Sequence, residues 1–128
     1  MRSAGRLVPA LALMAAIFAV SAQSSLPQTD TALDVVGRKA AHMTEFGLLW
    51  ALWLWALPGA RPRAALAALA ITLAYAAGDE LHQSFVAGRH ASAGDVAIDA
   101  AGVGVAAALW VARTRGARHP QRHVATSR

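Results

Sequence analysis

The apolar positions of the chain fall into four long blocks, and most of the polar positions gather between them. The blocks cover residues 7–22, 40–57, 64–85 and 96–112, and their apolar residues are continuous rather than spaced for one helix face. Blocks that are apolar all round are typical of helices that span a membrane. We therefore predict an all-α fold, a polytopic membrane four-helix bundle built from residues 1–112.

Composition supports this interpretation and excludes other classes of protein. Hydrophobic residues make up 56% of the 128 residues and charged ones 15%, which is more apolar surface than a soluble domain of this size can cover. The absence of cysteine excludes disulfides and thiol chemistry. The net charge of +5 comes from block ends and a basic tail, residues 113–128, without the aromatic or glycine-rich pattern of nucleic-acid binding. We expect that tail to be disordered and cytoplasmic, and we expect no nucleic-acid partner.

Basic residues predict how the bundle is oriented. They cluster before the first block, in the turn between the second and third blocks, and after the fourth block. The positive-inside rule places these three regions in the cytoplasm. We therefore expect a multi-pass protein of the cytoplasmic (inner) membrane, with both termini in the cytoplasm and the two remaining connections outside.

The first block has a second interpretation as a cleavable signal peptide. The stretch "MRSAGRLVPALALMAAIFAVSAQ" has a basic start, an apolar middle and a small-residue end, and its apolar part is short for a span. In both interpretations the segment after it lies outside. Pattern alone leaves the two alternatives open.

Two helix starts carry a recognisable capping pattern. "TALD" at Thr31–Asp34 and "SAGD" at Ser92–Asp95 fit the Ser/Thr-x-x-Asp/Glu motif, in which the first side chain bonds the backbone N–H of the fourth residue. The first motif predicts that the second helix begins near Ala32, ahead of its apolar block.

Three ionisable residues from different helices come out at one depth. His42 lies 15 residues before the end of its block, Asp79 lies 15 after the start of its block, and Asp99 lies 14 before Arg113. At about 1.5 Å per residue, each is roughly 21 to 22 Å from the inner boundary. Such groups usually face a bundle interior or a watery cavity. The sequence thus predicts an outward-facing polar pocket near the outer membrane face, lined by His42, Glu45, Asp79, Glu80, Gln83, Arg89, Ser92, Asp95 and Asp99.

Structural roles are an alternative for each of these residues. The acids and His42 could form an ion-pair network that holds the bundle together, Ser92 and Asp95 could only cap a helix, and Arg89 could be a solvated loop residue. Five acids face few bases, however, which argues against a fully neutralised network. Some carboxyl groups would then be protonated, hydrated or bound to a cationic ligand.

Small residues recur every four positions on the last block. This spacing lets helices approach closely in lipid, either within the bundle or between copies of the chain. Oligomerisation through this Gly/Ala face is therefore a further expectation. The positions are Gly102 and Ala106 on one row, and Ala100, Gly104 and Ala108 on the next.

Three longer motifs carry a resemblance to a known family. They are "KAAHMTEF" at residues 39–46, "DELHQSF" at residues 79–85 and "AGRHASAGD" at residues 87–95. In them the chain resembles the VanZ-like family of small membrane proteins, over about residues 7–112. The "SAQ" after the first block is similar to the family's Ser-x-Gln, which favours an uncleaved first helix.

The chain departs from the family pattern at two positions, with Ala87 where a proline is usual and Asp99 where an asparagine is usual. The resemblance implies a link to glycopeptide resistance, especially low-level teicoplanin resistance, in the protein that names the family. It implies no assigned reaction for most members.

Two functional hypotheses follow. In the first, the pocket binds a lipid-linked envelope component or a glycopeptide-type ligand, with Arg89 pairing a phosphate or carboxylate. In the second, the protein is a membrane enzyme acting on such a lipid-linked substrate, with catalytic His42, Asp79 and Glu80 as acid/base groups. A divalent cation among these three stays open, although no recognised metal motif is present. A transporter is disfavoured because no polar path continues inward from the acids.

Overall fold

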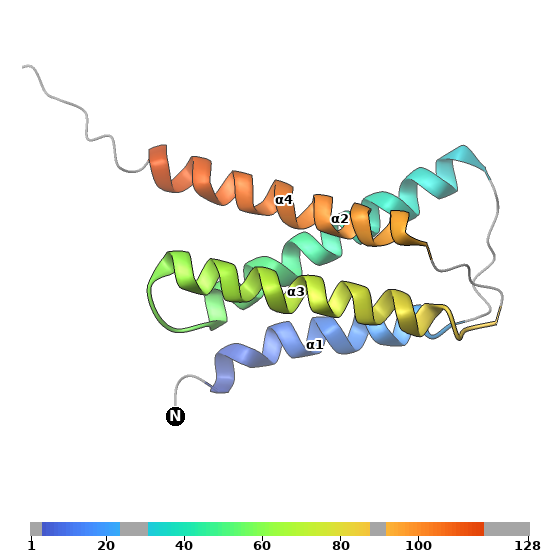
Figure 1. The fold of residues 1–128 in the computed structure, drawn as a ribbon, viewed down its shortest axis with the longest axis horizontal. Coiled ribbons are helices and arrows are strands. Elements are labelled where there is room, and N and C mark those ends of the chain that lie inside the picture. Colours follow the sequence, from blue (N-terminus) through green and yellow to red (C-terminus); the bar gives the residue numbers. More distant parts are fainter. Residues whose placement is uncertain (1–3, 24–30, 88–91, 117–128) are drawn as a thin grey trace, which may run out of the picture.

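The computed structural model describes residues 4–23, 31–87 and 92–116, and these residues form four helices joined in sequence (Figure 1). The helices are α1 (Ala4–Ser21), α2 (Ala32–Ala56), α3 (Arg61–Gln83) and α4 (Ala93–Gly116). The described residues contain no strand, and the prediction of an all-α membrane bundle is confirmed. By length and composition α1, α3 and α4 could each cross a membrane. α2 has 25 residues, and its first half carries Asp34, Arg38, Lys39 and His42.

The helix ends follow from local sequence. The Thr31 hydroxyl accepts a hydrogen bond from the Asp34 backbone N–H at 3.3 Å, and the Ser92 hydroxyl accepts one from the Asp95 N–H at 3.2 Å. Both predicted capping motifs are therefore confirmed. The turn between α2 and α3 contains Gly59 at φ +104°, a conformation that glycine adopts without strain. α4 continues to Gly116, past the predicted block end at 112, and residues 117–128 lie outside the described part.

α2 is the central helix and contacts each of the other three. α1 and α3 lie side by side, and α4 packs against α2 and α3 (Figure 1). The end of α1, the start of α2, the end of α3 and the start of α4 all lie at one end of the bundle. The turn between α2 and α3 and the last residues of α4 lie at the opposite end. This arrangement brings the polar halves of α2, α3 and α4 together.

Small side chains on α3 form much of its buried face. Ala64, Ala68, Thr72 and Ala76 recur every four residues and are all buried, so they share one side of the helix. Large side chains of α2 fill the core beside them, namely Phe46, Leu49, Trp50 and Trp53. Small-residue packing was predicted only for the fourth helix, so this face of α3 was not expected. One turn further along α3, the same row of positions reaches Glu80, at the acidic end of the helix.

The closest approach between helices is at Gly102. A Cβ atom on Gly102 would lie 2.1 Å from the carbonyl oxygen of Met43, so no other residue fits there without moving α4 away from α2. On the other side of the contact, a Cβ on Gly47 would lie 3.0 Å from the Gly102 carbonyl oxygen. The predicted Gly102 row thus packs inside the bundle, whereas a Cβ on Gly104 would meet nothing within 4 Å.

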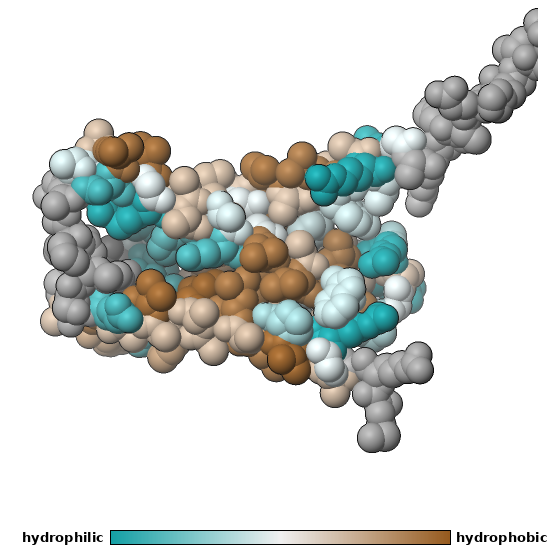
Figure 2. Space-filling model, turned by 180° about the vertical axis from the view of Figure 1, so that it is seen from behind, coloured by the Kyte–Doolittle hydropathy of each residue, from teal (hydrophilic) through white to brown (hydrophobic). Residues whose placement is uncertain are grey.

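α1 is an integral part of the fold. It contacts α2 and α3, and its Ala10 and Ile17 are buried in the common core. On the face shown in Figure 2, hydrophobic side chains cover much of the middle of the bundle, and hydrophilic ones gather toward its two ends. Cleavage after the first block would expose the faces of α2 and α3 that α1 covers.

Candidate functional site

Nine described polar side chains and the Ser92 backbone meet at the end of the bundle opposite the α2–α3 turn. We call this group the polar cluster. The four helices of the bundle run in alternating directions, so residues far apart in the sequence lie together at this end. The members are Ser21 from α1, Lys39, His42 and Glu45 from α2, Asp79, Glu80 and Gln83 from α3, Ser92 just before α4, and Asp95 and Asp99 from α4.

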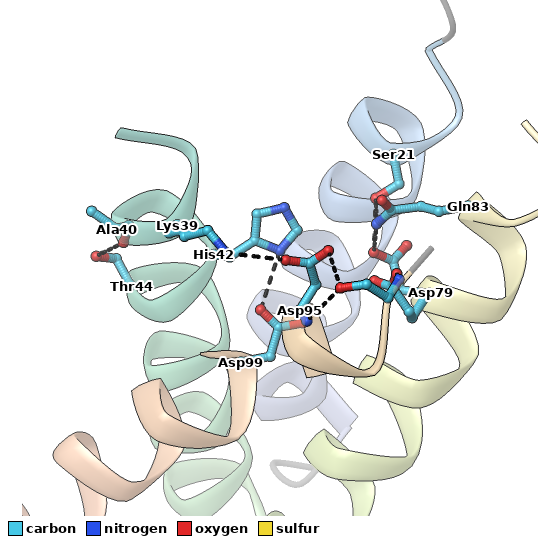
Figure 3. Close-up of polar contacts among 11 residues, drawn as sticks. Ser21, Lys39, Ala40, His42, Thr44, Asp79, Gln83, Asp95 and Asp99 are labelled. Carbon is cyan, nitrogen blue, oxygen red and sulfur yellow. Dashed lines mark hydrogen bonds and ion pairs between the residues drawn. The ribbon is translucent and has the colours of Figure 1, made fainter. Parts of the chain in front are cut away.

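His42 and Asp99 join α2 to α4. The imidazole Nδ1 lies 3.1 Å from Oδ1 of Asp99, and the Asp99 side chain is 3% exposed whereas that of His42 is 28% exposed. Nδ1 is engaged by Asp99 whichever of the two groups carries the shared proton, and Nε2 is the ring nitrogen left for another partner. The ring also stacks toward Phe46, with centroids 6.4 Å apart. The contact therefore fixes the orientation of a partly exposed imidazole (Figure 3).

Asp79 is held between α1 and α3. Its Oδ2 accepts hydrogen bonds from the Ser21 hydroxyl at 2.8 Å and from Gln83 Nε2 at 2.8 Å (Figure 3). The side chain is buried, and its other oxygen, Oδ1, has no hydrogen-bond partner among the described residues. Buried carboxylate oxygens are normally satisfied, because an unpaired one loses its hydration without replacement. Asp79 is thus joined to α1 and to Gln83 of α3 through Oδ2.

Glu80 binds the connection that leads into α4. Its Oε1 accepts a hydrogen bond from the Ser92 backbone N–H, so the buried carboxylate holds the start of α4 against the end of α3. The Ser92 hydroxyl in turn lies 2.9 Å from Asp95 Oδ2. Lys39 Nζ lies 3.6 Å from Asp95 Oδ1, with both side chains well exposed. This outer pair lies in water or at the headgroups, where such pairs contribute little to stability.

Negative charge exceeds positive charge within the polar cluster. Glu45 is half-buried beside the others, and its charge interacts with those of His42, Asp79 and Asp99. The charge of Glu80 likewise interacts with those of Asp95, Asp99 and His42. Against five carboxyl groups, the described members supply two basic side chains, Lys39 and a titratable His42. The described members of the polar cluster therefore offer acceptors for hydrogen-bond donors and cations.

Metal binding has little geometric support in the described part of the chain. Across residues 4–23, 31–87 and 92–116, no three His, Asp or Glu side chains are grouped so as to hold a metal ion. The cation considered among Glu80, Asp79 and His42 therefore lacks a preformed site there. Asp79 turns toward α1 while His42 turns toward α4, which separates the two groups (Figure 3).

The structure brings eight of the nine predicted lining residues to one end, and the ninth, Arg89, lies outside the described residues. It adds two that the residue-level argument did not place in the pocket. One is Lys39, which pairs with Asp95. Ser21 was missed, although the "SAQ" motif that carries it was noticed. The signal for Ser21 was that a serine ends an otherwise apolar block.

Comparison with known families places this geometry in context. A protein-family model described as VanZ/LLP1 matches residues 2–114, which is nearly the whole described bundle. The chain belongs to the VanZ/LLP1 family. Searches of curated proteins and of solved structures found no match. The VanZ/LLP1 match includes α1 and the polar cluster, so Ser21 and Asp79 both lie inside the family region.

Proposed function

We propose that this VanZ/LLP1 protein is an inner-membrane protein that binds a lipid-linked envelope component or a glycopeptide-type molecule at the polar cluster, from the outer side. The observation that carries the proposal is the surplus of carboxyl groups held at one end by three helices. Charged groups at membrane depth are costly, and they persist where they serve binding or transfer. A purely structural network would be closer to neutral.

The geometry suggests what the ligand offers to the protein. The half-buried carboxylate of Glu45 would accept hydrogen bonds from ligand amines or hydroxyls. His42, held through Nδ1, would present Nε2 to the ligand. Glycopeptides and the peptide-bearing head of a lipid-linked precursor both offer such donors. Binding of either kind would connect the protein to teicoplanin resistance.

The outward orientation rests on the distribution of basic residues. Arg61, Arg63, Arg113 and Arg115 lie on the ends of α3 and α4 opposite the polar cluster. The positive-inside rule assigns that end to the cytoplasm. The polar cluster then faces the envelope, where both classes of ligand are found.

Binding to the purified full-length protein in nanodiscs tests the proposal. The probes are teicoplanin and a polyprenyl-diphosphate-linked peptidoglycan precursor, each titrated against wild type, Glu45→Gln and Asp34→Asn. Asp34 is the described acid outside the polar cluster, so its substitution is a matched loss of charge. We expect saturable binding that E45Q weakens by about tenfold, equivalent to one charged hydrogen bond, and that D34N leaves unchanged. Equal effects of the two variants, or no saturable binding of either probe, would refute the proposal.

The enzyme alternative has one supporting observation, the Asp99-oriented imidazole. A carboxylate that fixes one imidazole nitrogen while the other faces a ligand is the arrangement of a general base. Glu80 would then be the second acid/base group. Incubation of the lipid-linked precursor with the protein tests this idea. A product that wild type forms and Glu80→Gln does not would favour the enzyme, and intact precursor with both proteins would favour binding alone.

A further inference from the structure

A groove lies between α2 and α4, toward the end of the bundle that carries the basic residues. It has a volume of about 840 Å³, and most of its lining is apolar. Leu48 and Trp55 line it from α2, and Val105 and Leu109 line it from α4. About half of each of these side chains is exposed, so the groove is concave and uncovered.

The groove results from the close contact at Gly102. There the backbones of α2 and α4 nearly touch, and from that point the two helices diverge toward the α2–α3 turn (Figure 1). α4 has no buried residue after Val103. Crossing helices that meet at glycines and then separate leave a wedge-shaped space, and no described helix fills it.

Positive charge lies where the wedge is widest. Arg61, the first residue of α3, and Arg113, in the last turn of α4, both line the groove. Arg6 lies close by, with its guanidinium carbon 5.5 Å from the centroid of the Trp55 ring. None of the described residues that line the groove is acidic. Guanidinium groups with no carboxylate partner favour a phosphate, which they can bind through two parallel hydrogen bonds.

The length of the groove matches one leaflet of a bilayer. Gly102 and Arg113 are eleven residues apart on α4, which is about 16 Å along the helix axis. Half of the hydrocarbon core of a bilayer is about 15 Å thick. An acyl chain that starts at Arg113 would therefore end near the Gly102 contact.

We propose that this groove holds an acyl chain of an anionic phospholipid, with its phosphate between Arg61 and Arg113. A second copy of the chain fits the same space less well. The described helix ends near the groove carry Arg6, Arg61, Arg63, Arg113 and Arg115, and a copy packed in parallel would set these like charges against one another. A phospholipid supplies both the apolar chain and the negative charge. The proposal is independent of what the polar cluster binds.

Native mass spectrometry of the full-length protein in detergent tests the proposal. Phosphatidylglycerol and phosphatidylcholine are titrated separately, and we expect one retained phosphatidylglycerol at a concentration about tenfold below that needed for phosphatidylcholine. R61Q/R113Q should remove this preference. R63Q/R115Q is the matched control, because it removes the same charge from the same two helix ends outside the groove, and it should retain the preference.

A groove-filling variant provides the second arm. Leu109→Trp places bulk in the groove and should abolish the retained lipid, whereas Leu66→Trp, on an exposed face of α3, should not. Three results would overturn the proposal. They are equal loss in the two arginine variants, lipid retention that L109W does not change, and a dimer that L109W dissociates, which would assign the groove to a second copy.

Discussion

Nδ1 of His42 lies 3.1 Å from Oδ1 of Asp99, one helical turn from the point where Gly102 contacts the backbone of Met43. A polar contact and the tightest backbone approach therefore lie side by side on the same pair of helices. The His42–Asp99 contact orients a candidate ligand-binding imidazole. The Gly102–Met43 contact sets the distance between α2 and α4 and therefore allows the first contact to form. The polar cluster thus depends on how closely α2 and α4 pack.

Asp99 should act on stability through its acceptor oxygen and on binding through its charge. Asp99→Ala removes the partner of His42 and should lower the free energy of unfolding by about 1–3 kcal/mol. Asp99→Asn introduces the residue usual in the family and retains a hydrogen-bond acceptor for His42. It should change the free energy of unfolding by less than about 1 kcal/mol. Thermal unfolding in detergent, followed by circular dichroism, measures both. Equal destabilisation by the two substitutions would show that the hydrogen bond is not what matters.

Gly102→Ala should loosen the bundle. The added Cβ would overlap the Met43 carbonyl oxygen, so α4 must move, and we expect a loss of about 1–3 kcal/mol of stability. Gly104→Ala is the control on the same helix, because its Cβ would meet nothing within 4 Å. It should be neutral or stabilise by up to about 1 kcal/mol, since alanine favours the helix. Denaturant titration in mixed micelles measures the stability change of each variant. Similar changes for both would contradict the close approach of α4 to α2 at Gly102.

Ser21→Ala should release α1 from α3. The substitution removes the hydroxyl that donates to Asp79 Oδ2 and leaves a buried carboxylate with one fewer donor, a loss of about 1–3 kcal/mol. Ser84→Ala is the matched control, because the exposed Ser84 hydroxyl donates to the Leu81 carbonyl within one turn. Limited proteolysis of the α1–α2 connection reports the release. Unchanged cleavage rates in S21A would argue against the contact.

Phe46 should be a key packing residue beneath the polar cluster. It is fully buried, and its ring lies 6.4 Å from the His42 ring and 6.2 Å from the Tyr75 ring. Phe46→Ala should cost about 3 kcal/mol, at the low end for a buried phenylalanine because lipid also solvates the separated helices. Phe85→Ala, at a side chain 81% exposed, should change stability by less than about 0.5 kcal/mol. Equal falls in melting temperature for Phe46→Ala and Phe85→Ala would contradict the burial of Phe46 in the core.

Much of the fold could be predicted because lipid imposes simple rules. Block lengths predicted the helices, and the Thr31 and Ser92 motifs predicted two helix starts. Counting residues along α2 and α4 predicted that His42 and Asp99 lie at one level, and the two side chains are in contact. Their role in ligand binding stays a prediction.

The remainder depended on which helix faces meet, and composition does not determine that. Alanine is so common in α3 that its buried row could not be distinguished from its exposed alanines. Ser21 needed the position of α1 relative to α3 before its partner Asp79 could be named. The groove required the crossing of α2 and α4, which follows from Gly102 meeting Met43 rather than from either helix alone.

Cysteine accessibility can decide whether the polar cluster faces the envelope, because the chain contains no cysteine. Ala93→Cys lies at the start of α4 beside the polar cluster, and Ala60→Cys lies in the α2–α3 turn; both positions are exposed. A membrane-impermeant maleimide is applied to spheroplasts. We expect that A93C is labelled at once and A60C only after permeabilisation. The reverse pattern would place the polar cluster in the cytoplasm and contradict the proposed function.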